Sequence, residues 1–230
     1  MGTGIKAGAV VSQVWAIYRN QFGVLVGTAI VLFALQFLIA LVLSGSLIFV
    51  VVVLFWVLNT LYQGAVVELV SDVKDGRRDY TVMQLLRSVE PVLWPLMIVS
   101  VLFGIGVAIG FVLIIVPGLF LLTIWSVVAP VTVLERPGVL AAFGRSRELV
   151  RGNGWSVFGV IILIYLAVVV ISVLAGAIGG GFGAGGRAIV QFAVTVLLAP
   201  VPALGASVLY FALRGEPVAP TSAQSPPTAA

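Results

Sequence analysis

Long uncharged apolar segments that alternate with short basic ones limit this chain more than any other feature. In residues 117–155, an apolar segment ends at Glu135 and Arg136, a short basic segment follows, and Trp155 opens another apolar segment. As a helix, an uncharged apolar segment of about 20 residues is long enough to cross the hydrocarbon core of a bilayer. The alternation therefore predicts membrane-spanning helices that are joined by short polar connections.

The amino-acid composition supports lipid as the main surroundings of the chain. Apolar residues make up 61% of the 230 residues and charged residues 9%, whereas soluble domains carry about 25% charged residues. The chain has neither Cys nor His, which excludes disulfides, thiolate metal sites and a histidine base. We therefore expect no enzyme activity, no metal and no cofactor.

Six segments have the length and composition of a membrane span. The sequence thus predicts an all-α polytopic helical bundle, with residues 1–213 forming one integral membrane domain. Residues 214–230 are rich in Pro, Ser, Thr and Ala and are predicted to be a disordered cytoplasmic tail. The predicted spans are residues 23–43, 47–69, 92–116, 118–134, 155–177 and 188–213.

Turn-forming residues separate the predicted spans within each pair. They are residues 44–46, then Pro117 with Gly118, and then the glycine-rich residues 179–186. A helix through the last segment is costly, since each Gly costs about 1 kcal/mol relative to Ala. Pro130 lies inside the fourth predicted span and is expected to kink it.

A short amphipathic segment precedes each pair of spans. The three segments are residues 8–20, the later part of 71–90, and residues 139–151. Each gathers its apolar side chains on one helical face, as helices in the membrane interface do, and the segments recur at intervals of roughly 60 to 70 residues. This pattern predicts three hairpins, each preceded by an interfacial amphipathic helix.

The basic residues fix the predicted orientation. If the first amphipathic segment is cytoplasmic, every Lys and Arg except Arg187 lies on that side, as the positive-inside rule requires. Both termini are then cytoplasmic, in the cell (inner) membrane. The net charge of +4 is explained by these loops, so we expect no nucleic-acid partner.

The third amphipathic segment carries the strongest candidate site. Arg145, Arg147 and Arg151 border an apolar stripe on which Ser146 lies, with its hydroxyl expected to bond to the carbonyl of Ala142. Arginines in this setting bind anionic lipid headgroups. The segment is thus predicted to dock lipid or a protein partner, and its rival interpretation is a passive anchor.

A weaker candidate consists of polar residues within the spans. Asn59 and Gln63 interrupt the second predicted span, and Glu68 and Glu135 lie near the ends of the second and fourth. Ionisable groups inside membranes are often functional. The alternative is that both glutamates lie close to the interface and reach water or a basic neighbour.

Residues 135–155 read ERPGVLAAFGRSRELVRGNGW. This segment resembles the E-x-x-G-x-x-x-A-x-x-R-S-x-x-L-V-x-G-x-x-W-like signature of the bacterial multipass family known as the glycerophosphodiester phosphodiesterase membrane domain, together with its YciC-like relatives. The resemblance implies about six spans. Some members are fused to a soluble phosphodiesterase barrel, for which this chain has neither room nor histidine, so the resemblance implies no such activity here.

Two function classes remain open. The first is a non-enzymatic membrane protein that binds lipid or a partner and influences envelope organisation. The second is a transporter or a transporter subunit that uses kinks at Pro130, Pro200 and Pro202 and the polar residues Asn59 and Gln63. A transporter should carry a coupling charge at mid-depth of a span, and none of the predicted spans shows one there. The sequence therefore favours the first class.

Overall fold

The structure, a computed structural model, describes residues 7–42, 48–76 and 82–216. Within these residues all regular elements are helices, which confirms the predicted all-α class. Six stretches are long and apolar enough to cross a membrane, as the sequence predicted. They are Phe22–Ile39, Phe49–Lys74, Leu86–Leu113, Ile115–Glu135, Gly154–Gly180 and Gly185–Leu213.

The elements follow one another with short connections. The first part of the chain forms α1 (Ala7–Asn20), α2 (Phe22–Val42), α3 (Ile48–Lys74), α4 (Val82–Val89), the 3₁₀ helix η2 (Glu90–Val92) and α5 (Leu93–Leu113). The second part forms α6 (Ile115–Ile124), α7 (Val128–Pro130), the π-helix η3 (Val131–Glu135), α8 (Val139–Val150), α9 (Gly154–Gly180), α10 (Gly183–Leu198) and α11 (Pro200–Leu213).

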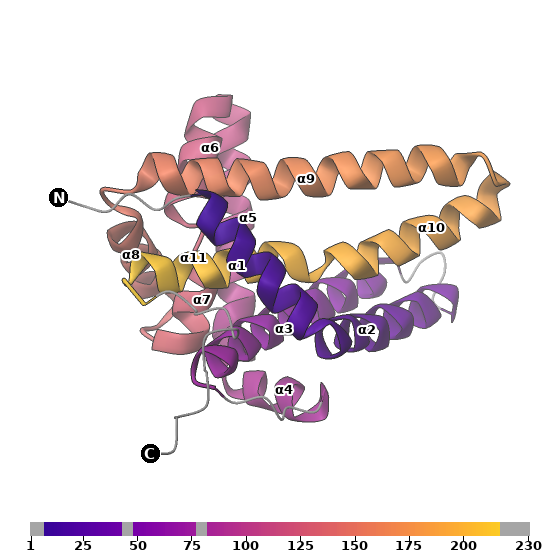
Figure 1. The fold of residues 1–230 in the computed structure, drawn as a ribbon, viewed down its shortest axis with the longest axis horizontal. Helices are drawn as coiled ribbons and strands as arrows, with labels where there is room; N and C mark the ends of the chain where they lie inside the picture. Colours follow the sequence, from indigo (N-terminus) through magenta and orange to yellow (C-terminus); the bar gives the residue numbers. More distant parts are fainter. Residues whose placement is uncertain (1–6, 43–47, 77–81, 217–230) are drawn as a thin grey trace, which may run out of the picture.

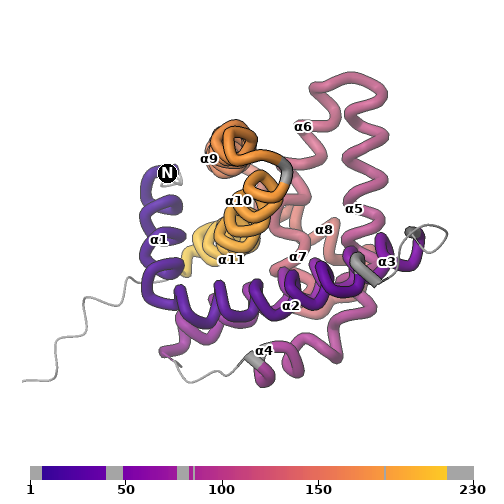
Figure 2. The backbone as a smooth tube through the Cα atoms, turned by 90° about the vertical axis from the view of Figure 1, so that its right-hand side faces the viewer, coloured from indigo at the N-terminus to yellow at the C-terminus, as the bar shows by residue number. Residues whose placement is uncertain are grey.

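The long helices pack as consecutive pairs, α2 with α3, α5 with α6, and α9 with α10. These pairs point in different directions. The turn between α5 and α6 lies at the top of both views, whereas the turn between α9 and α10 lies at the far right of Figure 1 and faces the viewer in Figure 2. The pairs therefore diverge toward their turns.

Nine of the 14 residues of helix α11 are buried. It contacts α1, α3 and α9, and Leu204, Leu209 and Tyr210 are fully buried on it. Small residues permit this packing, since a Cβ on Gly205 would lie 2.4 Å from the end of the Ile164 side chain. In lipid, where apolar burial gives helices little reason to associate, such close van der Waals contact is a main source of stability.

The turn between α5 and α6 lies at Ile114, not at Pro117 and Gly118 as predicted. Ile114 is extended, and both predicted turn residues belong to the first turn of α6. Proline is tolerated there because the first N–H groups of a helix have no partner inside it. Gly118 instead lets the helices touch, since a Cβ on Gly110 would lie 2.8 Å from the Gly118 Cα.

Most of residues 179–186 are helical, so the predicted glycine-rich loop is wrong. Helix α9 continues to Gly180, and α10 begins at Gly183. The glycines serve helix contact, because a Cβ on Gly179 would lie 3.0 Å from the Cα of Arg187. Close packing of α9 on α10 thus overrides the poor helix propensity of glycine.

The kink predicted at Pro130 is a full break that begins upstream. Helix α6 ends at Ile124 and α7 begins at Val128, so residues 125–127 lie outside both. Proline has no N–H, and its ring clashes with the carbonyl four residues earlier, here that of Ser126. The regular α-helical pattern of backbone hydrogen bonds therefore ends before Ser126.

Two predictions fall wholly or mainly outside the described residues. The predicted turn at residues 44–46 is one. Most of the predicted tail, residues 214–230, is the other. Of this tail the structure describes residues 214–216, in which Arg214 and Glu216 form a salt bridge of 3.3 Å. The second predicted span also differs at its end, because α3 continues past residue 69 to Lys74.

Candidate functional site

Helix α8 is fastened to the break in the fourth span by a buried face. Its buried side chains are Ala142, Ser146 and Val150, which lie one above the other at helical spacing. The Ser146 hydroxyl donates a 2.9 Å hydrogen bond to the carbonyl of Ile124, so the predicted bond to the Ala142 carbonyl is wrong. The Ile124 carbonyl accepts this bond because the N–H of Val128 bonds to a different carbonyl at the break.

Aromatic packing reinforces this attachment. Phe143 on α8 meets Trp125 at the break edge to face, with ring centroids 4.9 Å apart. The Trp125 ring also packs against α5, since a Cβ on Gly106 would lie 2.5 Å from it. The break, α5 and α8 therefore form one packed unit.

The docking prediction has Arg145 face lipid headgroups, but in the structure its guanidinium is paired with two carboxylates. Its Nε donates a 2.9 Å hydrogen bond to Glu135 Oε2, and Nη1 lies 3.4 Å from Glu148 Oε2. The bond to Glu135 is the main cause that raises the pKa of Arg145. Arg145 is thus a charged partner within the fold.

Glu135 binds a second partner through its other oxygen. The hydroxyl of Tyr210, a fully buried residue of α11, donates a 2.9 Å hydrogen bond to Glu135 Oε1. Arg214 in turn donates a 2.8 Å hydrogen bond to the Tyr210 oxygen, and this bond is the main cause that raises the pKa of Arg214. The chain of bonds from Arg145 to Arg214 joins α8, η3 and α11.

The same network reaches α3. Lys74 at the end of α3 forms an ion pair with Glu216, and its Nζ lies 4.6 Å from the centroid of the Phe211 ring. The hydrogen bond from Lys74 is the main cause that lowers the pKa of Glu216. We call the set the charged network; its members are Lys74, Glu135, Arg145, Tyr210, Arg214 and Glu216.

The structure divides the predicted docking residues into two kinds. Arg145 and Ser146 hold α8 in place, whereas Arg147 and Arg151 are exposed. Trp155, which follows them, is also exposed, at 87% of its surface. An exposed basic surface next to an exposed tryptophan therefore remains on α8 and the start of α9.

The four predicted intramembrane polar residues do not form one site. Glu135 belongs to the charged network. Glu68 is half-buried on α3, close enough to Asp72 and Arg136 for their charges to interact. Only Asn59 and Gln63 lie together, with Gln63 Nε2 donating a long 3.4 Å hydrogen bond to Asn59 Oδ1.

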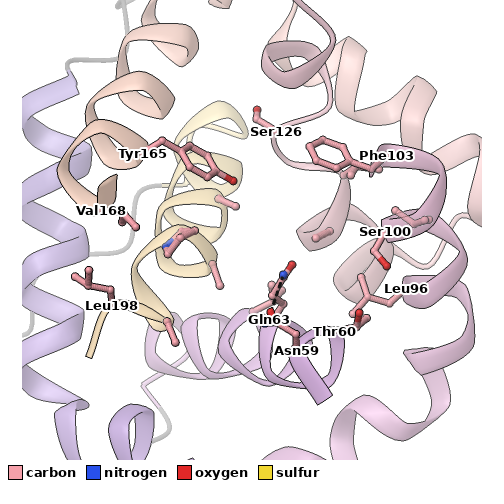
Figure 3. A pocket seen from close by; sticks show the side chains of 18 of the residues that line it. Asn59, Thr60, Gln63, Leu96, Ser100, Phe103, Ser126, Tyr165, Val168 and Leu198 are labelled. Atoms are coloured by element: carbon pink, nitrogen blue, oxygen red, sulfur yellow. Dashed lines mark hydrogen bonds between the residues drawn. The ribbon is translucent and has the colours of Figure 1, made fainter. Parts of the chain in front are cut away.

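Asn59 and Gln63 line a cavity of about 410 Å³ between the three helix pairs (Figure 3). Tyr165 of α9 extends into it from the opposite side, and Ser126 lies at its edge. None of the described residues that line the cavity is charged. Its remaining polar lining residues are Thr60, Ser100, Ser172 and Thr195.

Sequence reasoning missed several of these residues. Tyr210 and Arg214 are four residues apart at the end of the last span, so their helical spacing was a usable signal. Ser126 and Tyr165 gave no such signal, because an isolated hydroxyl in an apolar segment does not reveal which neighbours the fold will give it.

The fold defines a class, a multi-pass helical membrane protein. Comparison of the chain with models of known protein families found no match, and comparisons with curated proteins and with solved structures found none either. The resemblance of residues 135–155 to the membrane-domain family therefore rests on the motif alone.

Proposed function

We propose that this is a non-enzymatic, multi-pass protein of the bacterial cell membrane that docks anionic lipid headgroups through α8. The observation that supports this proposal is the exposure of Arg147 and Arg151 beside Trp155, while the neighbouring Arg145 is held in ion pairs. Near an anionic leaflet each basic residue contributes about 1 kcal/mol of attraction. The two arginines together give about 2 kcal/mol.

Three exposed tryptophans support an interfacial position for α1, α4 and α8. Trp15 on α1, Trp94 at the start of α5 and Trp155 at the start of α9 are 59%, 72% and 87% exposed, and tryptophan is enriched at membrane interfaces. In the proposed arrangement these short helices lie at the cytoplasmic surface, each before one hairpin, and both termini are cytoplasmic.

Single cysteines test this topology, because the chain has no native thiol. Gly181 lies at the turn between α9 and α10, and Asp75 and Arg151 lie at the proposed cytoplasmic side; all three are exposed. Ser146 is fully buried and unsuitable for labelling. We expect an impermeant maleimide to label Gly181→Cys on intact cells and the other two only after permeabilisation. External labelling of Asp75→Cys contradicts the orientation.

The docking proposal is tested with the double variant Arg147→Gln/Arg151→Gln. We expect it to insert normally but to bind phosphatidylglycerol about thirtyfold more weakly in native mass spectrometry at matched ionic strength, because about 2 kcal/mol of attraction is lost. The control is Arg19→Gln/Arg87→Gln, which removes two arginines from α1 and α4. If the double variant retains as much phosphatidylglycerol as the unaltered chain, the docking proposal is wrong. If the control variant loses as much as the double variant, the attraction is a general effect of basic charge and not a site on α8.

A transporter is the second candidate, and one observation favours it. The cavity is bordered by two helix breaks, one at Trp125 and Ser126 and one at Ala199 between α10 and α11, and broken helices around a central site are typical of transporters. Alternating access requires that a cysteine at Ala206, which lines the cavity, reacts with a methanethiosulfonate reagent from either side. Reaction from one side only contradicts transport.

A further inference from the structure

We propose that the cavity between the three helix pairs binds an uncharged amphipathic lipid of the diacylglycerol type. This site is separate from the α8 surface and does not depend on docking there. Its volume of about 410 Å³ falls within the range of about 300 to 1,000 Å³ that small-molecule sites have. Protein interiors leave few voids larger than a water molecule, so a space of this size requires an occupant.

Unused hydrogen-bonding groups converge on the cavity from three elements. The Asn59 and Gln63 pair on α3 uses one acceptor and one donor in its mutual bond, which leaves the Asn59 amino group and the Gln63 carbonyl for another partner. The buried Ser126 hydroxyl has no hydrogen-bond partner among the described residues. The Tyr165 hydroxyl points toward the same space (Figure 3).

Two other hydroxyls at the wall already have hydrogen-bond partners, which narrows the set of groups that can contact a ligand. Ser100 donates to the Met97 carbonyl at 2.9 Å and accepts from Trp56 Nε1 at 3.1 Å. Thr60 donates to the carbonyl of Trp56 at 2.9 Å. The groups left for a ligand are therefore the amide pair and the hydroxyls of Ser126, Tyr165, Ser172 and Thr195, which together offer both donors and acceptors.

The described residues that line the cavity carry no charge, and this determines the chemical class of the ligand. A phosphate or carboxylate in this cavity meets no cation among those residues, and an unpaired charge in an apolar surrounding is very costly. Ester carbonyls and a free hydroxyl, by contrast, match amide and hydroxyl partners without that cost. A diacylglycerol carries these groups and no charge.

The apolar part of the wall suits acyl chains, and the cavity is open to them. Phe33, Phe103 and Leu198 line its sides. Phe55 and Tyr165 line it as well and are each 47% exposed, so the cavity is not sealed. Because the helix pairs diverge toward their turns (Figure 2), a lipid can place its polar part against Asn59 while its chains remain in the bilayer.

Trp125 lines the cavity and provides a reporter for this site. The other four tryptophans, Trp15, Trp56, Trp94 and Trp155, are replaced by Phe, and the chain is placed in phosphatidylcholine nanodiscs. The probes are a diacylglycerol and a phosphatidylglycerol with the same brominated chains, since bromine quenches tryptophan on contact. We expect saturable quenching by the brominated diacylglycerol at low mole fraction and only weak, proportional quenching by the phosphatidylglycerol.

Substitutions within this reporter chain locate the binding. Ala206→Leu adds volume inside the cavity, and Ala177→Leu adds the same volume at an exposed position of α9. Gln63→Leu removes hydrogen-bonding groups at an exposed position, where substitutions leave folding essentially unchanged. We expect Ala206→Leu and Gln63→Leu each to weaken the saturable quenching about tenfold, and Ala177→Leu to leave it unchanged.

Three outcomes overturn the inference. Quenching that rises in proportion to mole fraction and is equal in Ala206→Leu and Ala177→Leu means that ordinary bilayer lipid fills the space. Equal saturable quenching by brominated phosphatidylglycerol means that the site does not select an uncharged lipid. Unchanged affinity in both Ala206→Leu and Gln63→Leu places binding elsewhere. The variant Arg147→Gln/Arg151→Gln is expected to keep the diacylglycerol signal, so failure of α8 docking and failure of this site are distinguished.

Discussion

The charged network and the central cavity share the helices α3 and α11 but are packed in opposite ways. In the network, Tyr210 is fully buried and both carboxylate oxygens of Glu135 accept hydrogen bonds. At the cavity, the Ser126 hydroxyl has no partner among the described residues, and Tyr165 is half exposed. Within lipid, polar contacts and close packing hold helices together, so the helices meet where such contacts exist and separate where they are missing.

Helices α3 and α11 make the comparison direct, because each passes through both regions. Helix α3 carries Asn59 at the cavity and Lys74 in the network, and α11 carries Ala206 at the cavity and Tyr210 in the network. On α11 the two environments are only four positions apart, at Ala206 and Tyr210. The difference therefore lies in the side chains and not in the helices that carry them.

The largest effect is expected from Glu135→Ala, which removes the centre of the network. Two hydrogen bonds to a charged group are lost and the Tyr210 hydroxyl stays buried without its acceptor, so the free energy of unfolding should fall by about 3 kcal/mol. The measurement is denaturant unfolding in detergent. Glu148→Ala is the control, since Glu148 is exposed and contributes within about 0.5 kcal/mol. Equal effects of the two substitutions contradict a stabilising network.

The next largest effect should come from Gly110→Ala, which tests close packing without polar groups. A Cβ at Gly110 lies 2.8 Å from the backbone of Gly118, whereas one at Gly104 meets nothing within 4 Å. Overpacking should cost Gly110→Ala about 2 kcal/mol, and Gly104→Ala should gain up to about 1 kcal/mol from helix propensity. Unfolding of both variants in the same detergent gives the comparison, and stabilisation of both contradicts the tight α5–α6 contact.

Ser146→Ala is expected to have a smaller effect of about 1 kcal/mol. It removes the hydrogen bond to the half-buried Ile124 carbonyl, which is then left without this donor. Gly144→Ala, at an exposed position of the same helix with no atom near its new Cβ, should be neutral or stabilising. Hydrogen exchange of α8 measures both, and unchanged protection in Ser146→Ala means that aromatic packing alone holds the helix.

The smallest effect is expected for the pH dependence of the ion pair between Lys74 and Glu216. Because Lys74 lowers the pKa of Glu216 below its usual 4.5, the ionised carboxylate stabilises the folded state. That contribution is complete above about pH 4.5 and is lost as the pH falls through the lower folded-state pKa. We expect the difference in unfolding temperature between the unaltered chain and Glu216→Gln to be small at pH 7 and to vanish toward pH 3. A difference that grows on acidification contradicts the ion pair.

The sequence predicted the helical class and the number of apolar spans because hydropathy and length decide both. It did not predict that the glycines of residues 179–186 stay helical or that a turn forms at Ile114. Both depend on how closely one helix approaches another, which local propensity does not contain.

The pairing of Glu135 with Arg145 shows the same limit within a short distance along the chain. The two residues are ten positions apart and are brought together by a reversal in which Arg136 is left-handed, with φ of 51°, and Gly138 has φ of 97°. Helical spacing rules cover neighbours three or four residues apart. They do not cover a contact made across such a reversal, so Arg145 was assigned to lipid and not to Glu135.

The long sequence separation within the charged network sets an order for assembly during synthesis. Glu135 precedes Tyr210 by 75 residues, and Lys74 precedes Glu216 by 142. At a synthesis rate of about 5 to 20 residues per second, Tyr210 emerges about 4 to 15 s after Glu135. The contact between Glu135 and Arg145 is local and forms early, whereas Lys74 gains its partner Glu216 only after α11 has been made. Helix α11 is therefore the element whose synthesis completes the charged network.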